Sequence, residues 1–314
     1  MTMPDRTPYD RATDLHDRAR TAPGTVDFAS VAALLRSRHS PSVDRHLLSC
    51  LAALADDRPD AVASVAGEVG ARLSLSDDRG LNAPATDCLA EIADADPAPL
   101  IDLVPMLAAL LDDDAEGVRR GATYVLSRIA SAYPDAVRPA VPSLADATTD
   151  DGGRAVNALS ALASVADWCG TLPADARDDV AELARHGRGP VRANAVAVLA
   201  NVARHRPADV EQHAEVLLAA VEEGEPGPRT NAAAGIAAIA REHPAAVSAA
   251  VPALVELLEA DDPRARRNAC RALGRLASAG DPAAASALDA VSALADADAD
   301  PDVRRLASWA VSAA

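Results

Sequence analysis

Hydrophobic and polar positions along this chain follow a pattern that recurs every 34 to 39 residues. Each repeat opens at a proline, runs through an apolar-periodic helical stretch, crosses an acidic or glycine-containing turn and ends in a second helical stretch. The opening prolines stand at positions 59, 97, 134, 173, 207, 244 and 282. Because one helical pair cannot bury its apolar face alone, the period predicts hairpins stacked on one another.

Two apolar positions recur in the second stretches, and we expect both in the core. The first is occupied by Leu126, Leu162, Leu199, Ile236 and Leu273, and the second by Ile129, Val165, Val202, Ile239 and Leu276. Three first stretches carry an inner proline, which predicts an interrupted helix; these are Pro105, Pro142 and Pro252. The chain has one Phe, two Trp and three Tyr but is 49% hydrophobic, a composition that favours closely packed helices.

The second stretches carry the motif V-R-x-x-A after an acidic turn, at Val118-Arg119…Ala122 and Val191-Arg192…Ala195. This pattern resembles HEAT repeats, including the short variant of phycobilisome-lyase-like proteins. The resemblance covers residues 27–314 and implies an all-α fold, a right-handed α-solenoid of about eight HEAT-type helical hairpins. We expect residues 1–26 to form a flexible or loosely helical N-terminal segment.

The charge pattern changes the expected surface. The formal net charge is −17, and all 30 cationic residues are Arg. An acidic, Lys-free and Asp-rich composition resembles that of cytoplasmic proteins from salt-accumulating halophiles, where at ~1 M salt the Debye length is only ~3 Å. The N-terminus lacks an apolar signal region and no apolar run reaches ~20 residues, so we expect a cytoplasmic protein without a membrane partner.

Two polar rows recur at repeat spacing: Asn157, Asn194, Asn231 and Asn268, and Arg119, Arg192, Arg229 and Arg266. We interpret both rows as structural, with Arg pairing to carboxylates of the turns and Asn bonding to backbone between repeats. The two rows resemble the inter-repeat ladders of HEAT proteins. Ligand contact is the alternative.

Positions opposite the core differ between repeats. They are Arg120, Tyr124 and Arg128 in one repeat, small residues in the next three, Arg267, Arg271 and Arg275 in the seventh, and Arg305 and Trp309 in the last. Second helices line the concave side of HEAT solenoids, so the resemblance implies a channel of small side chains with arginine clusters at both ends. These eight residues are the predicted partner-binding positions.

Chemistry-bearing motifs are scarce. The four cysteines form no CxxC pair, and no His-Glu dipeptide of the kind used by HEAT-type deoxyhypusine hydroxylases occurs. The run DADADPD from Asp296 begins like a calcium loop but lacks its glycine and final glutamate, so it is interpreted as a turn with Asp302 as N-cap. We therefore predict no catalytic residue, cofactor or metal.

The resulting functional prediction is a non-catalytic protein–protein interaction scaffold or adaptor that binds a partner segment, for instance an acidic one, along the concave face. A HEAT-type lyase-like enzyme or enzyme subunit is the alternative. A nucleic-acid- or chromatin-associated HEAT protein is a weaker one, because the net charge opposes duplex binding. The last helix has no capping repeat, which leaves self-association through the C-terminal end open.

Overall fold

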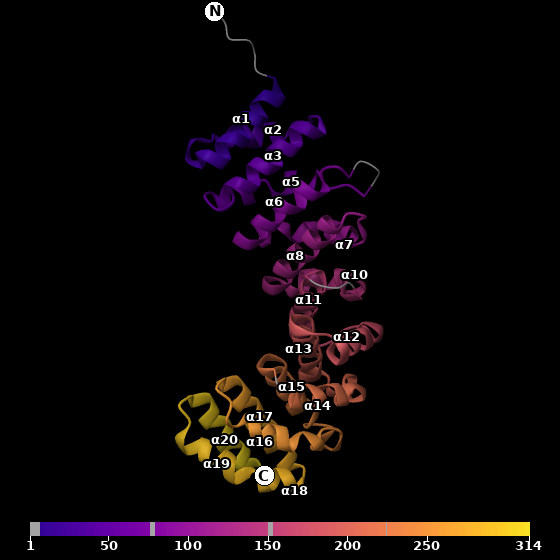
Figure 1. Ribbon diagram of the computed structural model, residues 1–314, viewed down its shortest axis with the longest axis vertical. Coiled ribbons are helices and arrows are strands. Elements are labelled where there is room, and N and C mark those ends of the chain that lie inside the picture. The colour runs from indigo at the N-terminus through magenta and orange to yellow at the C-terminus, as the bar shows by residue number, and fades with distance from the viewer. Residues whose placement is uncertain (1–6, 76–78, 150–152, 224) are drawn as a thin grey trace, which may run out of the picture. The chain divides into compact units, whose positions relative to one another are not determined.

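The computed structural model describes residues 7–75, 79–149, 153–223 and 225–314, and these ranges contain helices and turns but no strand. The chain divides into two compact units, unit 1 (Met1–Ala161) and unit 2 (Leu162–Ala314). The prediction of an all-α solenoid is confirmed (Figure 1).

Unit 1 begins with a helix that precedes the first hairpin. Its α-helices are α1 (Pro8–Thr21), α2 (Phe28–Leu35), α3 (Pro41–Leu54), α4 (Pro59–Ala63), α5 (Ala66–Gly70), α6 (Asn82–Ala95), α7 (Val104–Ala109), α8 (Glu116–Ala132), α9 (Pro134–Val137) and α10 (Val141–Asp146). The 3-10 helix η1 (Pro23–Thr25) connects α1 to α2. Other short 3-10 helices complete the first helices of hairpins: η2 (Ala98–Leu103), η3 (Leu110–Asp112), η4 (Arg138–Ala140) and η5 (Ala147–Thr149). Helix α11 (Gly153–Cys169) contains the division between the units.

Unit 2 continues with hairpins of the same kind. Its α-helices are α12 (Ala174–His186), α13 (Gly189–His205), α14 (Ala214–Glu222), α15 (Pro226–Ile239), α16 (Val251–Leu257), α17 (Pro263–Ser278), α18 (Pro282–Ser286), α19 (Leu288–Ala297) and α20 (Pro301–Ala313). The 3-10 helices are η6 (Pro207–Asp209), η7 (Glu211–His213), η8 (Pro244–Ala246) and η9 (Ser248–Ala250). The second helices α13, α15, α17 and α20 contact one another in that order, which builds the stack in this unit.

The inner prolines interrupt the first helices at the predicted places. In each of the three hairpins a 3-10 turn ends just before the proline, and an α-helix starts one residue ahead of it, as with Pro105 in α7. Pro142 and Pro252 hold the same position in α10 and α16. Proline is tolerated in the first turn of a helix, because the N–H groups there have no partner within the helix and the missing one is not needed. Each helix break therefore falls just before the proline.

The core lies where the second helices meet their neighbours. All ten recurring apolar positions are buried, with at most 1% of any side chain exposed. Alanine and glycine fill the gaps between them; Gly274 is buried in α17 against Ala310 of α20. The sequence prediction of these core residues is confirmed.

The described part of the N-terminal segment is helical. Helix α1 is closed by a capping box in which Thr7 and Asp10 exchange hydrogen bonds. It buries Ala12, Leu15 and Ala19 and contacts α3 of the first hairpin. Residues 1–6 lie outside the described residues, and the boundary at residue 26 stays a prediction.

The acidic turn before the last helix has a different cap from the predicted one. Asp300 is the N-cap of α20, and its carboxylate accepts hydrogen bonds from the backbone N–H groups of Asp302 and Val303. The prediction of Asp302 as N-cap is therefore wrong. Pro301 takes the first helical position, which moves the cap one residue before it.

Candidate functional site

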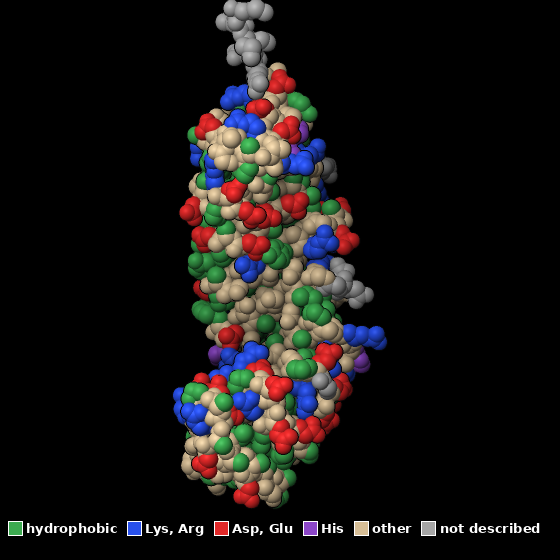
Figure 2. Space-filling model, turned by 60° about the vertical axis from the view of Figure 1, so that its left-hand side comes forward, with side chains coloured by type: hydrophobic (Ala, Val, Ile, Leu, Met, Phe, Trp, Pro, Cys, Tyr) green, Lys and Arg blue, Asp and Glu red, His purple; other side chains and the backbone are tan. Residues whose placement is uncertain are grey.

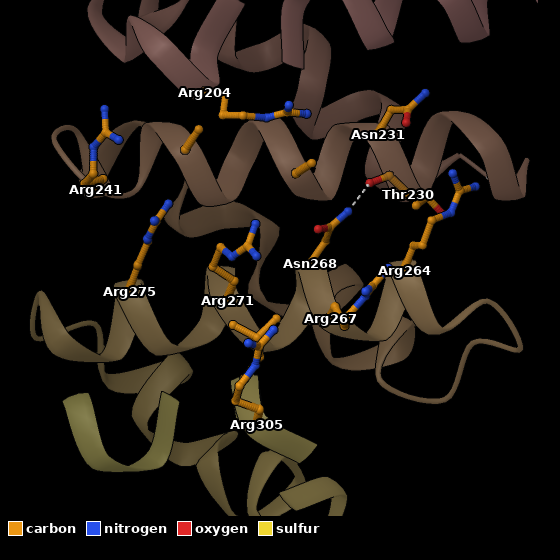
Figure 3. Close-up of a pocket in the computed structure, with 13 residues that line it drawn as sticks. Arg204, Thr230, Asn231, Arg241, Arg264, Arg267, Asn268, Arg271, Arg275 and Arg305 are labelled. Carbon is orange, nitrogen blue, oxygen red and sulfur yellow. Dashed lines mark hydrogen bonds between the residues drawn. The ribbon is translucent and has the colours of Figure 1, made fainter. Parts of the chain in front are cut away.

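The second helices of unit 2 enclose a pocket of about 400 Å³. On α17, residues four apart share one face of the helix, so Arg267, Arg271 and Arg275 point in a common direction. Arg271 and Arg275 extend toward α15, as Figure 3 shows, whereas Arg267 reaches Asp302 on α20. Small side chains of α15 leave the space that the arginines enter. The complete lining is Arg204, Thr230, Asn231, Ala234, Ala238, Arg241, Arg264, Arg267, Asn268, Arg271, Arg275, Arg305 and Leu306.

The lining contains seven guanidinium groups and no carboxylate. Five of these groups contact acids outside the lining. Asp302 accepts from both Arg267 and Arg305, at 3.1 and 2.8 Å. The other three contacts are Arg204–Asp167, Arg241–Glu242 and Arg264–Asp262. Figure 2 shows arginine side chains gathered on the C-terminal part of the molecule, beside exposed acids.

Two arginines of the α17 row, Arg271 in its middle and Arg275 at its end, have no carboxylate partner among the described residues. The Arg271 side chain forms no hydrogen bond or ion pair with any residue in the described ranges, and Arg275 donates to the backbone carbonyl of Ala237. Burial lowers the pKa of Arg271, and the charges of Arg204, Arg267 and Arg305 lower it further. The pKa of Arg275 is lowered by burial and then by Arg271 and Arg241. The centre of the pocket is thus a place where positive charge is crowded and a bound anion would be stabilised.

The matching row in unit 1 has a different environment. The carboxylate of Asp94 on α6 accepts a hydrogen bond from the Tyr124 hydroxyl at 2.5 Å and an ion pair from Arg128 at 2.9 Å. The hydrogen bond to Asp94 raises the pKa of Tyr124. Arg120 lies 3.9 Å from Glu116 in its own helix. The structure therefore brings these three predicted residues together around acids of the same unit.

The last predicted position lies beside the pocket. Trp309 on α20 is 39% exposed and does not belong to the lining, whereas Arg305 on the same helix does. The indole ring lies against α17, where its nearest atom is 3.1 Å from the point at which a Cβ on Gly274 would stand.

The asparagine row connects successive second helices at Asn268. Asn268 donates from Nδ2 to the carbonyl of Thr230 in the preceding repeat at 3.0 Å. Asn201, outside the predicted row, makes the same kind of bond to Ala163 at 2.9 Å. The side chains of Asn157 and Asn231 form no hydrogen bond with a described residue, and Asn194 lies half-buried on α13. Asn231 lines the pocket beside Asn268.

The arginine row holds each hairpin to its own turn, mainly through backbone. Arg119 donates to the carbonyls of Asp113 and Asp114, and not to their carboxylates. Arg192 and Arg229 donate to the carbonyls of Ala184 and Val221. Such backbone contacts fix the angle between the two helices of a hairpin.

Three members of this row also reach an acid of the following hairpin. The pairs are Arg192–Glu223, Arg229–Glu256 and Arg266–Asp298. The last is bidentate, with N···O distances of 2.7 and 2.8 Å, and the hydrogen bond from Arg266 lowers the pKa of the buried Asp298. The row stabilises the stack in unit 2, since each charge-assisted bond crosses from one hairpin to the next.

Three lining arginines were missed by the sequence prediction: Arg204, Arg241 and Arg264. A signal for two of them was present, because Arg204 and Arg241 are 37 residues apart and occupy one repeat position. Counting back by repeats, Asp167 and Asp94 occupy that position in earlier hairpins. The change from acid to arginine along this row marks where the pocket begins.

Other chemistry is sparse in the described ranges. No three His, Cys, Asp or Glu side chains there converge as metal ligands. None of the helices described is both long and apolar enough to cross a bilayer. Burial raises the pKa of the Cys50, Cys88 and Cys270 thiols to about 12, so these thiols are inert at neutral pH.

Comparison with known proteins gives a family match and structural neighbours. Residues 214–312 match the family of HEAT repeats. A search of curated proteins found no match. A designed armadillo repeat protein in complex with the peptide (KR)4 is similar at 22% identity and a TM-score of 0.55, over 67% of this chain and 98% of that one.

A second solved structure comes from work on a conserved phosphorylation switch that controls the interaction between cadherin and beta-catenin. It is 16% identical with a TM-score of 0.79, over 97% of this chain and 72% of that one. At such identities the likeness shows the fold alone. Residues 214–312 are therefore similar to HEAT repeats, and the two neighbours show an α-solenoid fold.

Proposed function

We propose that this chain is a non-catalytic scaffold that binds an acidic segment of a partner protein in the arginine-lined pocket of unit 2. The observation that carries the proposal is Arg271, a half-buried guanidinium without a partner among the described residues, at the centre of a lining that holds no carboxylate. A guanidinium offers five N–H donors in a fixed fork that matches a carboxylate. An acidic side chain entering the pocket would occupy that fork.

The surface beside the pocket suits an extended or helical segment. Thr230, Ala234 and Ala238 form a row of small side chains on α15, and Ala193 and Ala197 continue it on α13. Small residues let a backbone approach closely, while the arginines at the end of the row fix its direction. The structurally similar designed protein binds (KR)4, a basic peptide. The opposite charge of this pocket favours an acidic one.

Salt limits how the partner is recognised. We place the scaffold in a salt-rich cytoplasm, because its net charge is −17 and its 30 cations are all Arg. At ~1 M salt the Debye length is ~3 Å, so only groups in direct contact attract each other appreciably. Recognition then rests on hydrogen-bonded guanidinium–carboxylate pairs in the pocket and not on long-range attraction.

The pocket lining supports nucleic-acid binding less well than binding of an acidic protein segment. Phosphates would suit the guanidinium groups, but no aromatic side chain lines the pocket to stack on a base.

The exposed Trp309 and Val311 of α20 favour, in addition, self-association through the C-terminal end. Sedimentation of the purified chain would report that contact independently of the pocket.

The test is charge reversal at Arg271. A fluorescent peptide with one glutamate per helical turn is titrated with wild-type protein and with Arg271→Glu, and binding is followed by anisotropy. We expect at least about a tenfold loss of affinity, since the new carboxylate repels the ligand and also pairs with the neighbouring arginines. Arg185→Glu is the matched control, because Arg185 is an exposed arginine of α12 paired with Glu182 and Glu215 outside the pocket.

Equal affinities of wild type and Arg271→Glu would overturn the proposal, provided that both proteins give the same circular-dichroism spectrum. Affinity capture from the native lysate with the same two proteins extends the test to the natural partner. A partner retained by wild type and by Arg185→Glu but lost from Arg271→Glu supports the pocket as its binding site.

A further inference from the structure

The charges of the pocket do not balance with a single carboxylate. Seven guanidinium groups line it and four carboxylates contact them, which leaves three positive charges unmatched. One carboxylate of a ligand would neutralise only one of these. A phosphate monoester carries close to two negative charges at neutral pH and would neutralise most of the excess.

The donors also come from more directions than a carboxylate can use. A carboxylate is planar, and its two oxygens accept hydrogen bonds close to that one plane. Arg271 has Arg267 one turn before it and Arg275 one turn after it on α17, and Arg305 of α20 also lines the pocket. Arg204 adds a charge from α13. A tetrahedral group with three acceptor oxygens matches such a set of forks.

We infer that the pocket around Arg271 binds a phosphate dianion, carried by a phosphorylated side chain within the acidic segment of the partner. This inference rests on the proposed function and specifies its ligand. The lining contains no aromatic residue and few apolar ones, Ala234, Ala238 and Leu306 among them, so it offers no platform for a nucleobase. A volume of about 400 Å³ holds a phosphorylated side chain together with ordered water.

The structure contains an internal competitor for this ligand. The Asp302 carboxylate bridges Arg267 and Arg305, at 3.1 and 2.8 Å, and so engages two guanidinium groups at the edge of the pocket. An incoming phosphate and Asp302 compete for the same donors. Removing the charge of Asp302 should therefore strengthen phosphate binding, which a merely structural role of the arginine row does not predict.

The experiment compares three probes by anisotropy and competition. The first is the glutamate-rich peptide of the preceding test, and the second is the same peptide with its central glutamate replaced by phosphoserine. Inorganic phosphate, as a competitor, is the third. We expect the phosphopeptide to bind wild type at least about tenfold more tightly than the glutamate peptide, and far more tightly than inorganic phosphate.

Variants sharpen the comparison. In Arg271→Gln the advantage of phosphoserine over glutamate should disappear, while in Asp302→Asn the phosphopeptide should bind several-fold more tightly than to wild type. Arg185→Gln should leave all affinities unchanged. Unchanged circular-dichroism spectra exclude misfolding as the cause of any loss.

Each remaining outcome is decisive. Equal affinity for both peptides, lost in Arg271→Gln, overturns the phosphate inference and keeps the acidic-segment scaffold. Inorganic phosphate binding as tightly as the phosphopeptide overturns the side chain as the carrier of the phosphate. An oligonucleotide that displaces the phosphopeptide at lower concentration than either peptide overturns both, as does the absence of any binding.

Discussion

Arg128 in unit 1 and Arg275 in unit 2 occupy the same position of their second helices, yet Arg128 pairs with a carboxylate and Arg275 donates to a backbone carbonyl. In each unit the residue 34 positions earlier stands on the preceding second-helix segment. In unit 1 it is Asp94, which lies 2.9 Å from Arg128. In unit 2 it is Arg241, whose charge, after burial and the charge of Arg271, also lowers the pKa of Arg275. The sign of one neighbouring residue decides whether a repeated arginine is satisfied within the fold or available to a ligand.

A row of arginines at repeat spacing is therefore not by itself a binding site. The rows at Arg120 and Arg267 were assigned the same role from sequence. In the row of Arg120, the side chains of Tyr124 and Arg128 are held by Asp94. The row of Arg267 lines a pocket in which the Arg271 side chain has no partner among the described residues.

The largest expected effect comes from the helix contact that supports the unit 2 pocket. In Gly274→Ala the new Cβ would stand 2.6 Å from the Cβ of Ala310 and 2.8 Å from its Cα. A backbone atom cannot rotate away, so α20 must shift from α17 and carry Arg305 with it. We expect a loss of about 1–3 kcal/mol in the free energy of unfolding, measured by urea titration followed by circular dichroism.

Gly117→Ala on α8 of unit 1 is the control for this prediction. Nothing lies within 4 Å of the Cβ that it adds. Alanine is the better helix former by up to about 1 kcal/mol, so this variant should lose no stability. Equal stabilities of Gly274→Ala and wild type would contradict the close contact of α17 and α20.

A second prediction converts the unit 2 arrangement into that of unit 1. Arg241→Asp places a carboxylate where Asp94 stands in the earlier repeat, within reach of Arg275. We expect about a tenfold weaker affinity for the glutamate-rich peptide by anisotropy, because the internal acid replaces the ligand. Arg206→Asp gives the same charge change outside the pocket lining and should leave the affinity unchanged.

The smallest effect is expected from the converse change. Asp94→Asn removes the acid that Tyr124 and Arg128 share in unit 1. These groups are partly exposed, so the free energy of unfolding should fall by only about 0.2–1 kcal/mol. The double variant Asp94→Asn with Arg271→Glu lacks the central arginine of the unit 2 pocket but frees Arg128 in unit 1. In this variant we expect weak binding of the acidic peptide at unit 1. If the double variant binds the peptide no better than Arg271→Glu alone, the proposed site is limited to unit 2.

The fold was predictable from sequence because its determinants are local and repeated. The period placed Leu126 and its equivalents in the core, and the inner prolines such as Pro105 placed the helix breaks. Both follow from spacing within one hairpin. The helical N-terminal segment was less evident, since α1 lies outside the repeat and is held by its capping box and by burial of Leu15.

The site was predictable only in part, because its pairs join residues about one repeat apart. Arg267 was predicted to contact a partner, and its guanidinium pairs with Asp302 on the next second helix. Whether two such residues meet depends on the rotation between hairpins, which spacing alone does not give. Arg204 and Arg241 were missed for the same reason.

The arginines of the pocket occur at equivalent positions of successive hairpins, Arg204 with Arg241, and Arg267 with Arg305. Duplication of a single hairpin therefore copies its cations together with the surface that presents them. A solenoid of this kind can enlarge its cationic surface in one genetic event, and later substitutions at positions such as 94 and 302 decide which copies are silenced by an internal acid. The repeat serves in this way as a unit of inheritance for charge as well as for fold.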